Sequence, residues 1–261
     1  MSGMIALFDS GLGGLSVWSE VFKLMPNEDY LYISDSGNAP YGPRPVDYII
    51  NRAQIISRFL IERGADIIIV ACNTATAAAI TNLRESFDIP FIGMEPAIKP
   101  AALHSTSGVV GVLATAGTLK GRLYLNTLAN FAGDIKVIER VGNGLVEAVE
   151  RGDLNTPETI KILHEHIDPM VEAGADHIVL GCTHYPFLTS QIESIVPSSV
   201  EIVNPAPAVA RQAQRVYRKL EVENSDGIKK CKFFTTGEFA PWIREYILSI
   251  APNSQFININ I

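Results

Sequence analysis

Cysteines are scarce in this chain, and they are not arranged as in a disulfide framework or a zinc site. Three occur among 261 residues, namely Cys72, Cys182 and Cys231, and no two of them form a C-x-x-C pair. An odd number of widely spaced cysteines does not match the paired pattern of disulfide-stabilised secreted domains, and zinc knuckles need closely spaced ligands. We therefore expect reduced thiols and no bound metal.

The chain also lacks runs of basic residues and long apolar runs. With a formal net charge of −7, it offers no electrostatic footprint for nucleic acid or for an anionic membrane surface. No segment approaches the roughly 20 apolar residues of a transmembrane helix, and the N-terminal MSGMIALFDS has no charged n-region of a signal peptide. We expect a cytoplasmic protein that binds a small molecule, with no nucleic acid and no membrane as partner.

What the chain does contain is an internal repeat. GADIIIVACNTATAAA, at residues 64–79, nearly recurs as GADHIVLGCTHYPFL from Gly174, and aligning the two copies places Cys182 on Cys72. A chain of this length with 47% hydrophobic residues can bury two cores of ordinary domain size. The repeat therefore predicts two similar halves, each with a cysteine at the same point.

Short β-rich runs and helical patterns alternate in the same order in both halves. For the first half, the predicted strands are 4–8, 30–34, 67–71 and 90–92, and the predicted helices are 15–25, 46–63 and 74–86. For the second half, the strands are 109–113, 136–140, 178–180 and 200–203, and the helices are 119–130, 144–151, 156–173 and 187–196. A proline-containing crossover at 93–108 connects the halves. A tail from Pro205, with a helix, a strand at 232–235, a helix at 239–249 and a last run at 256–261, has no partner in the repeat.

Buried β-branched strands joined by helices are typical of parallel sheets that are covered on both faces. The predicted fold class is α/β, with two pseudo-symmetric, doubly wound parallel-sheet lobes facing a central cleft. Ligands of such sheets bind outside the carboxyl ends of the strands, and both Cys72 and Cys182 fall there. If a pseudo-twofold axis relates the lobes, the two cysteines approach one cleft from opposite sides.

Each repeated cysteine stands where a strand gives way to a polar pair that opens a helix, in ACNTA and in GCTHYP. A helix N-terminus stabilises a thiolate, and His184 could deprotonate Cys182. Asp9, at the end of the first strand, could do the same for Cys72. Cys231 lies outside the repeat, and we expect it to be a core residue.

Two thiols across one cleft suit stereoinversion at a carbon acid. One base removes the proton from one face of the carbon, and a conjugate acid on the opposite face returns a proton. A single thiol would instead suit covalent acyl chemistry, which needs no second cysteine.

Two further segments have both an ordinary and a functional interpretation. DSGLGG, at residues 9–14, is glycine-rich, but Ser16 replaces the third glycine of G-x-G-x-x-G, so the nucleotide signal is weak, and Asp9 or Ser10 could simply cap a helix. Glu147 and Glu150 lie at i,i+3 on a predicted helix, where they form either a solvated face or a functional carboxylate.

The motifs DSGLGG, PYGPRP, ACNTATAAA and GCTHYP, in this order and spacing, resemble the glutamate racemases of the aspartate/glutamate racemase superfamily over nearly the whole chain. The resemblance implies cofactor-independent racemisation of glutamate, which supplies D-glutamate for peptidoglycan and so for the cell wall and cell shape, and a possible homodimer. It implies one lobe of residues 1–96 plus 207–261 and another of residues 97–206.

The same resemblance implies roles for individual residues. Cys72 would take the proton of D-glutamate with help from Asp9, and Cys182 that of L-glutamate with help from His184. Glu150 matches the auxiliary carboxylate of the family by its position before an Arg-Gly pair, with Glu147 as the alternative one helical turn earlier. The implied substrate contacts are Asp9, Ser10, Tyr41, Gly42, Asn73, Thr74, Thr118, Thr183 and His184.

Three alternatives remain open from the sequence. A sister enzyme of the superfamily would act on aspartate or a hydantoin, or would isomerise maleate. A thiol hydrolase would form a thioester on one cysteine, and a non-catalytic amino-acid-binding protein would bind its ligand without proton exchange. The repeated cysteine argues against the last two. Since no lysine motif suggests a Schiff base, the chemistry needs desolvation and placed dipoles, and we expect the lobes to close over the substrate.

Overall fold

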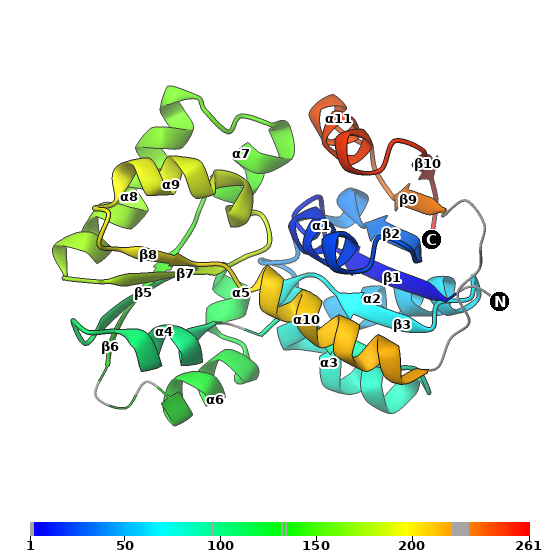
Figure 1. Ribbon diagram of the computed structural model, residues 1–261, viewed down its shortest axis with the longest axis horizontal. Coiled ribbons are helices and arrows are strands. Elements are labelled where there is room, and N and C mark those ends of the chain that lie inside the picture. The colour runs from blue at the N-terminus through cyan, green and yellow to red at the C-terminus, as the bar shows by residue number, and fades with distance from the viewer. Residues whose placement is uncertain (1–2, 96, 132, 134, 221–229) are drawn as a thin grey trace.

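Two parallel β-sheets, one in each half of the repeat, organise the chain (Figure 1). The computed structural model describes residues 3–95, 97–131, 133, 135–220 and 230–261. The chain passes from the first sheet to the second after one strand that ends at Gly93, and returns after a strand that ends at Val203. Pro96, at the predicted boundary between the lobes, lies outside the described residues.

The first sheet has the strand order β10-β9-β2-β1-β3-β4, and every neighbouring pair is parallel. Strands β1 and β3 are buried almost throughout, as expected of central strands covered on both faces. The bounds are β1 (Met4–Asp9), β2 (Asp29–Ser34), β3 (Ile67–Val70), β4 (Phe91–Gly93), β9 (Cys231–Thr235) and β10 (Gln255–Asn258).

The second sheet has the order β6-β5-β7-β8 and is also entirely parallel. Its strands are β5 (Val109–Ala114), β6 (Lys136–Val141), β7 (His177–Gly181) and β8 (Glu201–Val203). This order matches β2-β1-β3-β4 strand for strand, so β3 and β7, which precede the two repeated cysteines, hold equivalent places. The prediction of two doubly wound α/β lobes is confirmed.

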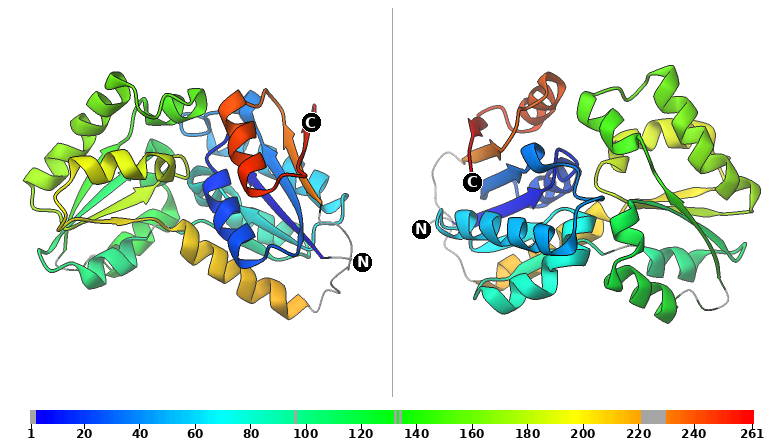
Figure 2. Two further views of the ribbon diagram at one scale, coloured as in Figure 1. Left: turned by 45° about the horizontal axis from the view of Figure 1, so that its top comes forward. Right: turned by 180° about the vertical axis from the view of Figure 1, so that it is seen from behind.

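Helices cover both faces of each sheet (Figures 1 and 2). In the first lobe, one face packs against α1 (Leu15–Leu24), α10 (Ala206–Tyr217) and α11 (Pro241–Ile250), and the other against α2 (Val46–Ile61) and α3 (Asn73–Ser86). In the second lobe, α7 (Leu145–Arg151), α8 (Pro157–Glu172) and α9 (Thr189–Ile195) cover one face, while α4 (Ile98–His104) and α6 (Arg122–Phe131) cover the other. None of the helices described is both long and apolar enough to cross a membrane.

The structure corrects two predicted segments. The crossover contains the helix α4, in which Pro100 falls in the first turn, where a missing N–H costs no intrahelical hydrogen bond. The helix predicted at 119–130 is divided into α5 (Ala116–Leu119) and α6. Gly121 separates them, and a Cβ there would lie 2.7 Å from that of Ala77 on α3. Short 3-10 helices, η1 (Ser36–Asn38), η2 (Tyr185–Leu188) and η3 (Arg218–Leu220), complete the fold.

We expect Trp18 to be a main contributor to the core beneath α1. Its side chain is fully buried, and its ring meets that of Phe233 edge-on at a centroid distance of 4.9 Å. Trp18→Ala should lower the free energy of unfolding by about 3–5 kcal/mol, measured by urea denaturation followed by circular dichroism. Leu103→Ala is the control because Leu103 is 68% exposed, and an equal loss in both variants would contradict the assignment.

Candidate active site

The carboxyl ends of both sheets meet around a small cavity that both repeated cysteines line. Cys72 follows β3 and Cys182 follows β7, and both are buried. The cavity measures about 20 Å³, which is little more than the space that a water molecule needs. Its lining residues are Ser10, Pro40, Tyr41, Gly42, Cys72, Asn73, Thr74, Thr115, Val146, Cys182, Thr183 and His184.

Cys72 is connected to Asp9 through a serine hydroxyl. The thiol donates to Ser10 Oγ at 3.7 Å, and Ser10 Oγ donates to Asp9 Oδ1 at 3.3 Å. Cys72 is also the N-cap of α3, and its Sγ accepts a hydrogen bond from Ala75 N at 3.4 Å. Burial, and after it the charge of Asp9, raises the pKa of Cys72 to about 12 despite these hydrogen bonds, so the resting form is the thiol.

Cys182 meets its candidate base directly. Its Sγ lies 3.7 Å from His184 Nδ1, and the opposite ring nitrogen, Nε2, donates to Glu150 Oε1 at 2.6 Å. Burial by itself would lower the pKa of His184, but the hydrogen bonds and charges of Cys182 and Glu150 raise it well above 6.5. Burial would likewise raise the pKa of Glu150, and the hydrogen bond and charge of His184 lower it. The imidazolium and carboxylate therefore stabilise each other.

Glu150 also joins the two lobes. The oxygen that accepts from His184, Oε1, accepts a second hydrogen bond from Leu12 N in the glycine-rich loop at 2.8 Å. Glu147, one turn earlier on α7, instead lines an adjoining cavity of about 300 Å³ that shares Pro40, Gly42, Thr115 and Val146 with the cysteine cavity. The contact with His184 therefore distinguishes the two glutamates.

Asp9 forms a second connection between the lobes. Its carboxylate is fully buried, with Oδ1 accepting from Gly11 N at 2.7 Å and Oδ2 from Thr183 Oγ1 at 2.8 Å. Burial raises the pKa of Asp9 to about 6, and the charge of His184 and these hydrogen bonds limit the rise. Asp9 does not cap a helix, because the N-cap of α1 is Gly14.

The glycines of DSGLGG allow the two lobes to approach each other closely. A Cβ at Gly11 would overlap the carboxylate of Glu150, and a Cβ at Gly13 would overlap the ring of His184. Ser16 Oγ adds a hydrogen bond to Thr183 O at 2.8 Å across the same junction. This close packing accounts for Gly11 and Gly13 in the loop.

Asn73 is a polar side chain without a partner at the cavity. It is 4% exposed, and neither its amide nitrogen nor its amide oxygen has a hydrogen-bond partner in the described part of the chain. Thr74, beside it, exchanges a hydrogen bond of 2.9 Å with Thr115, which exchanges another of 2.9 Å with Thr118. A buried, unpaired amide at a cavity indicates a place where a ligand supplies the missing partner.

The structure differs from the predicted substrate contacts at Thr118, and it shows two further residues at or near the cavity, Thr115 and Asp35. Thr118 is buried but does not line the cavity, whereas Thr115, the N-cap of α5, does. Sequence reasoning missed Thr115, although a threonine at the end of a strand was a usable signal. It also missed Asp35, whose carboxylate accepts from the hydroxyl of Tyr41 at 2.5 Å.

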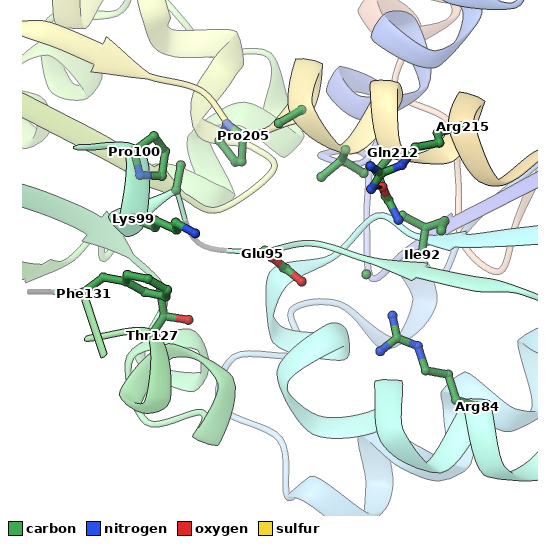
Figure 3. A pocket seen from close by; sticks show the side chains of 14 residues that line it. Arg84, Ile92, Glu95, Lys99, Pro100, Thr127, Phe131, Pro205, Gln212 and Arg215 are labelled. Atoms are coloured by element: carbon green, nitrogen blue, oxygen red, sulfur yellow. Dashed lines mark hydrogen bonds between the residues drawn. The ribbon is translucent and has the colours of Figure 1, made fainter. Parts of the chain in front are cut away.

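A larger cavity of about 430 Å³ lies beside the two connections between the lobes (Figure 3). Glu95 and Pro205, next to the two crossings of the chain, line it, as do Arg84, Lys99 and Arg215. None of its lining residues also lines the cysteine cavity.

Known proteins are similar to this chain in sequence and in fold. Residues 24–213 match the family model of Asp/Glu/Hydantoin racemases. The chain is 45% identical to the glutamate racemase of Ectopseudomonas mendocina over 90% of this chain and 89% of that protein, and 50% identical to that of Methylococcus capsulatus over 81% and 78%. It superposes with a TM-score of 0.86 on the Escherichia coli glutamate racemase solved with L-glutamate and the activator UDP-MurNAc-Ala, at 30% identity, with 99% of this chain and 98% of that chain covered.

We expect Glu150 to hold His184 in its charged form. Glu150→Gln should lower the pKa of the His184 imidazole, because it removes the charge that favours the imidazolium. The pKa is read from an NMR titration of the five histidines, with the His184 signal assigned from a His184→Asn spectrum. Glu147→Gln is the matched control on the same helix, and a larger shift in the control than in Glu150→Gln would refute the pairing.

Proposed function

Because the chain belongs to the Asp/Glu/Hydantoin racemase family, we propose that it interconverts L-glutamate and D-glutamate. The observation that carries the proposal is the pair of cysteines, one from each lobe, that line one cavity, with Ser10 and Asp9 beside Cys72 and His184 beside Cys182. The names of the similar proteins support glutamate as the substrate. A sister substrate such as aspartate is the alternative to test.

In this mechanism the α-proton leaves one face of the substrate and a proton arrives on the other. Cys72, as a thiolate, takes the proton of D-glutamate, and the thiol of Cys182 protonates the opposite face of the carbanion. The reverse reaction begins at Cys182. To form the thiolate of Cys72, its proton passes through Ser10 to Asp9. To form the thiolate of Cys182, its proton passes to Nδ1 of His184, and the resulting imidazolium, paired with Glu150, compensates the negative charge.

The carbanion needs stabilisation that this chain's own groups can supply. The Asn73 amide, the hydroxyl of Thr74 and the N-terminus of α3 surround the side of the cavity next to Cys72, where they can donate to the substrate carboxylates. Thr183 offers a hydroxyl from the other lobe, and Thr115 takes the role that Thr118 had in the sequence-based prediction. The proposal includes no cofactor, since side chains take and return the proton.

Substrate entry requires the lobes to separate. A cavity of about 20 Å³ does not hold glutamate, and the contacts from Glu150 to Leu12 and from Asp9 to Thr183 join the lobes across it. We propose that these contacts break on opening and re-form around the bound substrate, which excludes water from the carbanion.

The proposal also divides the chain into a lobe of residues 1–96 plus 207–261 and a lobe of residues 97–206. Strands β5 to β8 all fall in the second range, which supports this division. The proposal further holds that the enzyme works in the cytoplasm, supplies D-glutamate for peptidoglycan and can form a homodimer.

The first test follows the α-proton in D2O. The wild type should invert both enantiomers with deuterium wash-in, monitored by circular dichroism and NMR. Cys72→Ser and Cys182→Ser should each lose inversion by about 10²–10⁴-fold, because each removes one of the two acid–base groups. Residual exchange without inversion should be confined to D-glutamate in Cys182→Ser and to L-glutamate in Cys72→Ser.

The controls for this test separate the alternatives. Cys231→Ser should retain inversion, since Cys231 lies in β9, away from the cavity. A trapped thioester would indicate hydrolase chemistry, and binding without exchange would indicate a sensor. Exchange on aspartate but not on glutamate would indicate a sister racemase.

A second test uses the pKa of Asp9, which is raised to about 6. If the ionised Asp9 accepts the proton of Cys72, kcat/KM should fall as the pH drops through about 6, because protonation removes the acceptor. This acidic limb of the profile of kcat/KM against pH must be the same for L-glutamate and for D-glutamate, since the two enantiomers are equally stable. Asp9→Asn should lose the limb with most of the activity, whereas Asp47→Asn, at an exposed position on α2, should keep both.

A further inference from the structure

The C-terminal tail has no counterpart in the second lobe, yet it lies against a loop of the candidate active site. Strand β9 pairs with β2, and β10 pairs with β9, at one edge of the first sheet (Figure 1). The loop after β2, residues 35–45, contains Tyr41 and Gly42, which line the cysteine cavity. The tail therefore adjoins a segment that would touch the substrate.

Asp35 connects the tail to this loop. Its carboxylate is fully buried and accepts five hydrogen bonds from four side chains. Arg52 donates through Nε at 3.0 Å and through Nη2 at 2.8 Å, and Tyr41 donates through its hydroxyl at 2.5 Å. Asn38 donates through Nδ2 at 3.0 Å, and Thr236, in the tail, through Oγ1 at 2.8 Å.

Two residues of the tail, Thr236 and Ile261, contact Asp35 or the groups around it. Thr236 Oγ1 accepts from Gly37 N at 3.0 Å, and Thr236 N donates to Ser34 O at 3.1 Å. Arg52, which pairs with Asp35, donates from Nη1 to the carbonyl oxygen of Ile261 at 2.7 Å. Two parts of the tail, Thr236 directly after β9 and Ile261 after β10, therefore contact Asp35 or its partners.

Tyr41 connects Asp35 to the cavity, because its hydroxyl donates to Asp35 and the residue lines the cavity. Its side chain is 1% exposed, and burial, together with Asp35, raises the pKa of the phenol, so the hydroxyl remains a donor. Tyr41 and its neighbour Gly42 both line the cavity. Within the described residues, nothing accepts a hydrogen bond from the backbone N–H of either residue, so both are free to donate to a carboxylate.

We propose that the tail positions the substrate-binding loop through Asp35, and that Thr236 and Asp35 are positioning residues for glutamate binding. The inference rests on the proposed function, because it concerns how the same cavity holds its substrate. Acting on substrate binding rather than on proton transfer, these residues should influence KM and leave kcat nearly unchanged.

Thr236→Val tests the proposal with little risk to folding, because Thr236 is only partly buried and valine has nearly its shape. We expect KM for both glutamate enantiomers to rise roughly 2–10-fold, because the variant loses the hydrogen bonds that Thr236 Oγ1 makes with Asp35 and Gly37, and kcat to stay within about twofold. Thr236→Ser should restore the wild-type KM, because it restores the hydroxyl. Tyr41→Phe, which removes the hydroxyl that contacts Asp35, should reproduce the effect.

Thr235→Val is the matched control. The hydroxyl of Thr235, the last residue of β9, accepts from Gly237 N at 3.1 Å, and among the described contacts of Asp35 there is none to this hydroxyl. Equal KM changes in Thr235→Val and Thr236→Val, or a fall in kcat alone, would overturn the proposal. An active wild type with an unchanged KM in Thr236→Val refutes only this inference, whereas a wild type that does not racemise glutamate refutes the proposed function and this inference with it.

Discussion

The arrangement of the site depends on two sheets that bring their carboxyl ends together, and the carboxylate of Glu150 holds them there. One of its oxygens accepts from Leu12 in the first lobe and from His184 in the second. A partly buried carboxylate is less costly when it is paired and hydrogen-bonded, so contacts from both lobes stabilise this oxygen. The small cavity, the charged form of His184 and the glycines of the DSGLGG loop all depend on this contact.

The fold is nearly symmetric, but the surroundings of the two cysteines are not. Cys72 reaches its carboxylate through Ser10, whereas Cys182 faces an imidazolium directly. Burial, and after it the charge of Asp9, raises the pKa of the Cys72 thiol. The duplicated framework therefore gives one cleft two thiols at equivalent strand ends, each with different neighbours.

The tail adds a second asymmetry. Only the first sheet carries two extra strands, and the residues between and after them surround Asp35, which anchors a loop of the cavity. A site built from loops needs such support, because loops by themselves do not hold donors in a fixed geometry. The tail, which lies outside the repeat, thus supports the same site from one edge of the first sheet.

The sequence by itself determined the two-lobed fold, the equivalence of β3 and β7 and the cysteine at the end of each, because hydrophobic periodicity and strand ends are local properties of the chain. It left Glu147 and Glu150 open, which share a helix pattern, and it named Thr118 rather than Thr115. Only the tertiary structure shows that Glu150 contacts His184 and that Thr115 lines the cavity. It alone also shows the contact of Asp35 with Thr236, 201 positions away, because side chains so distant in the chain meet through packing that no local pattern records.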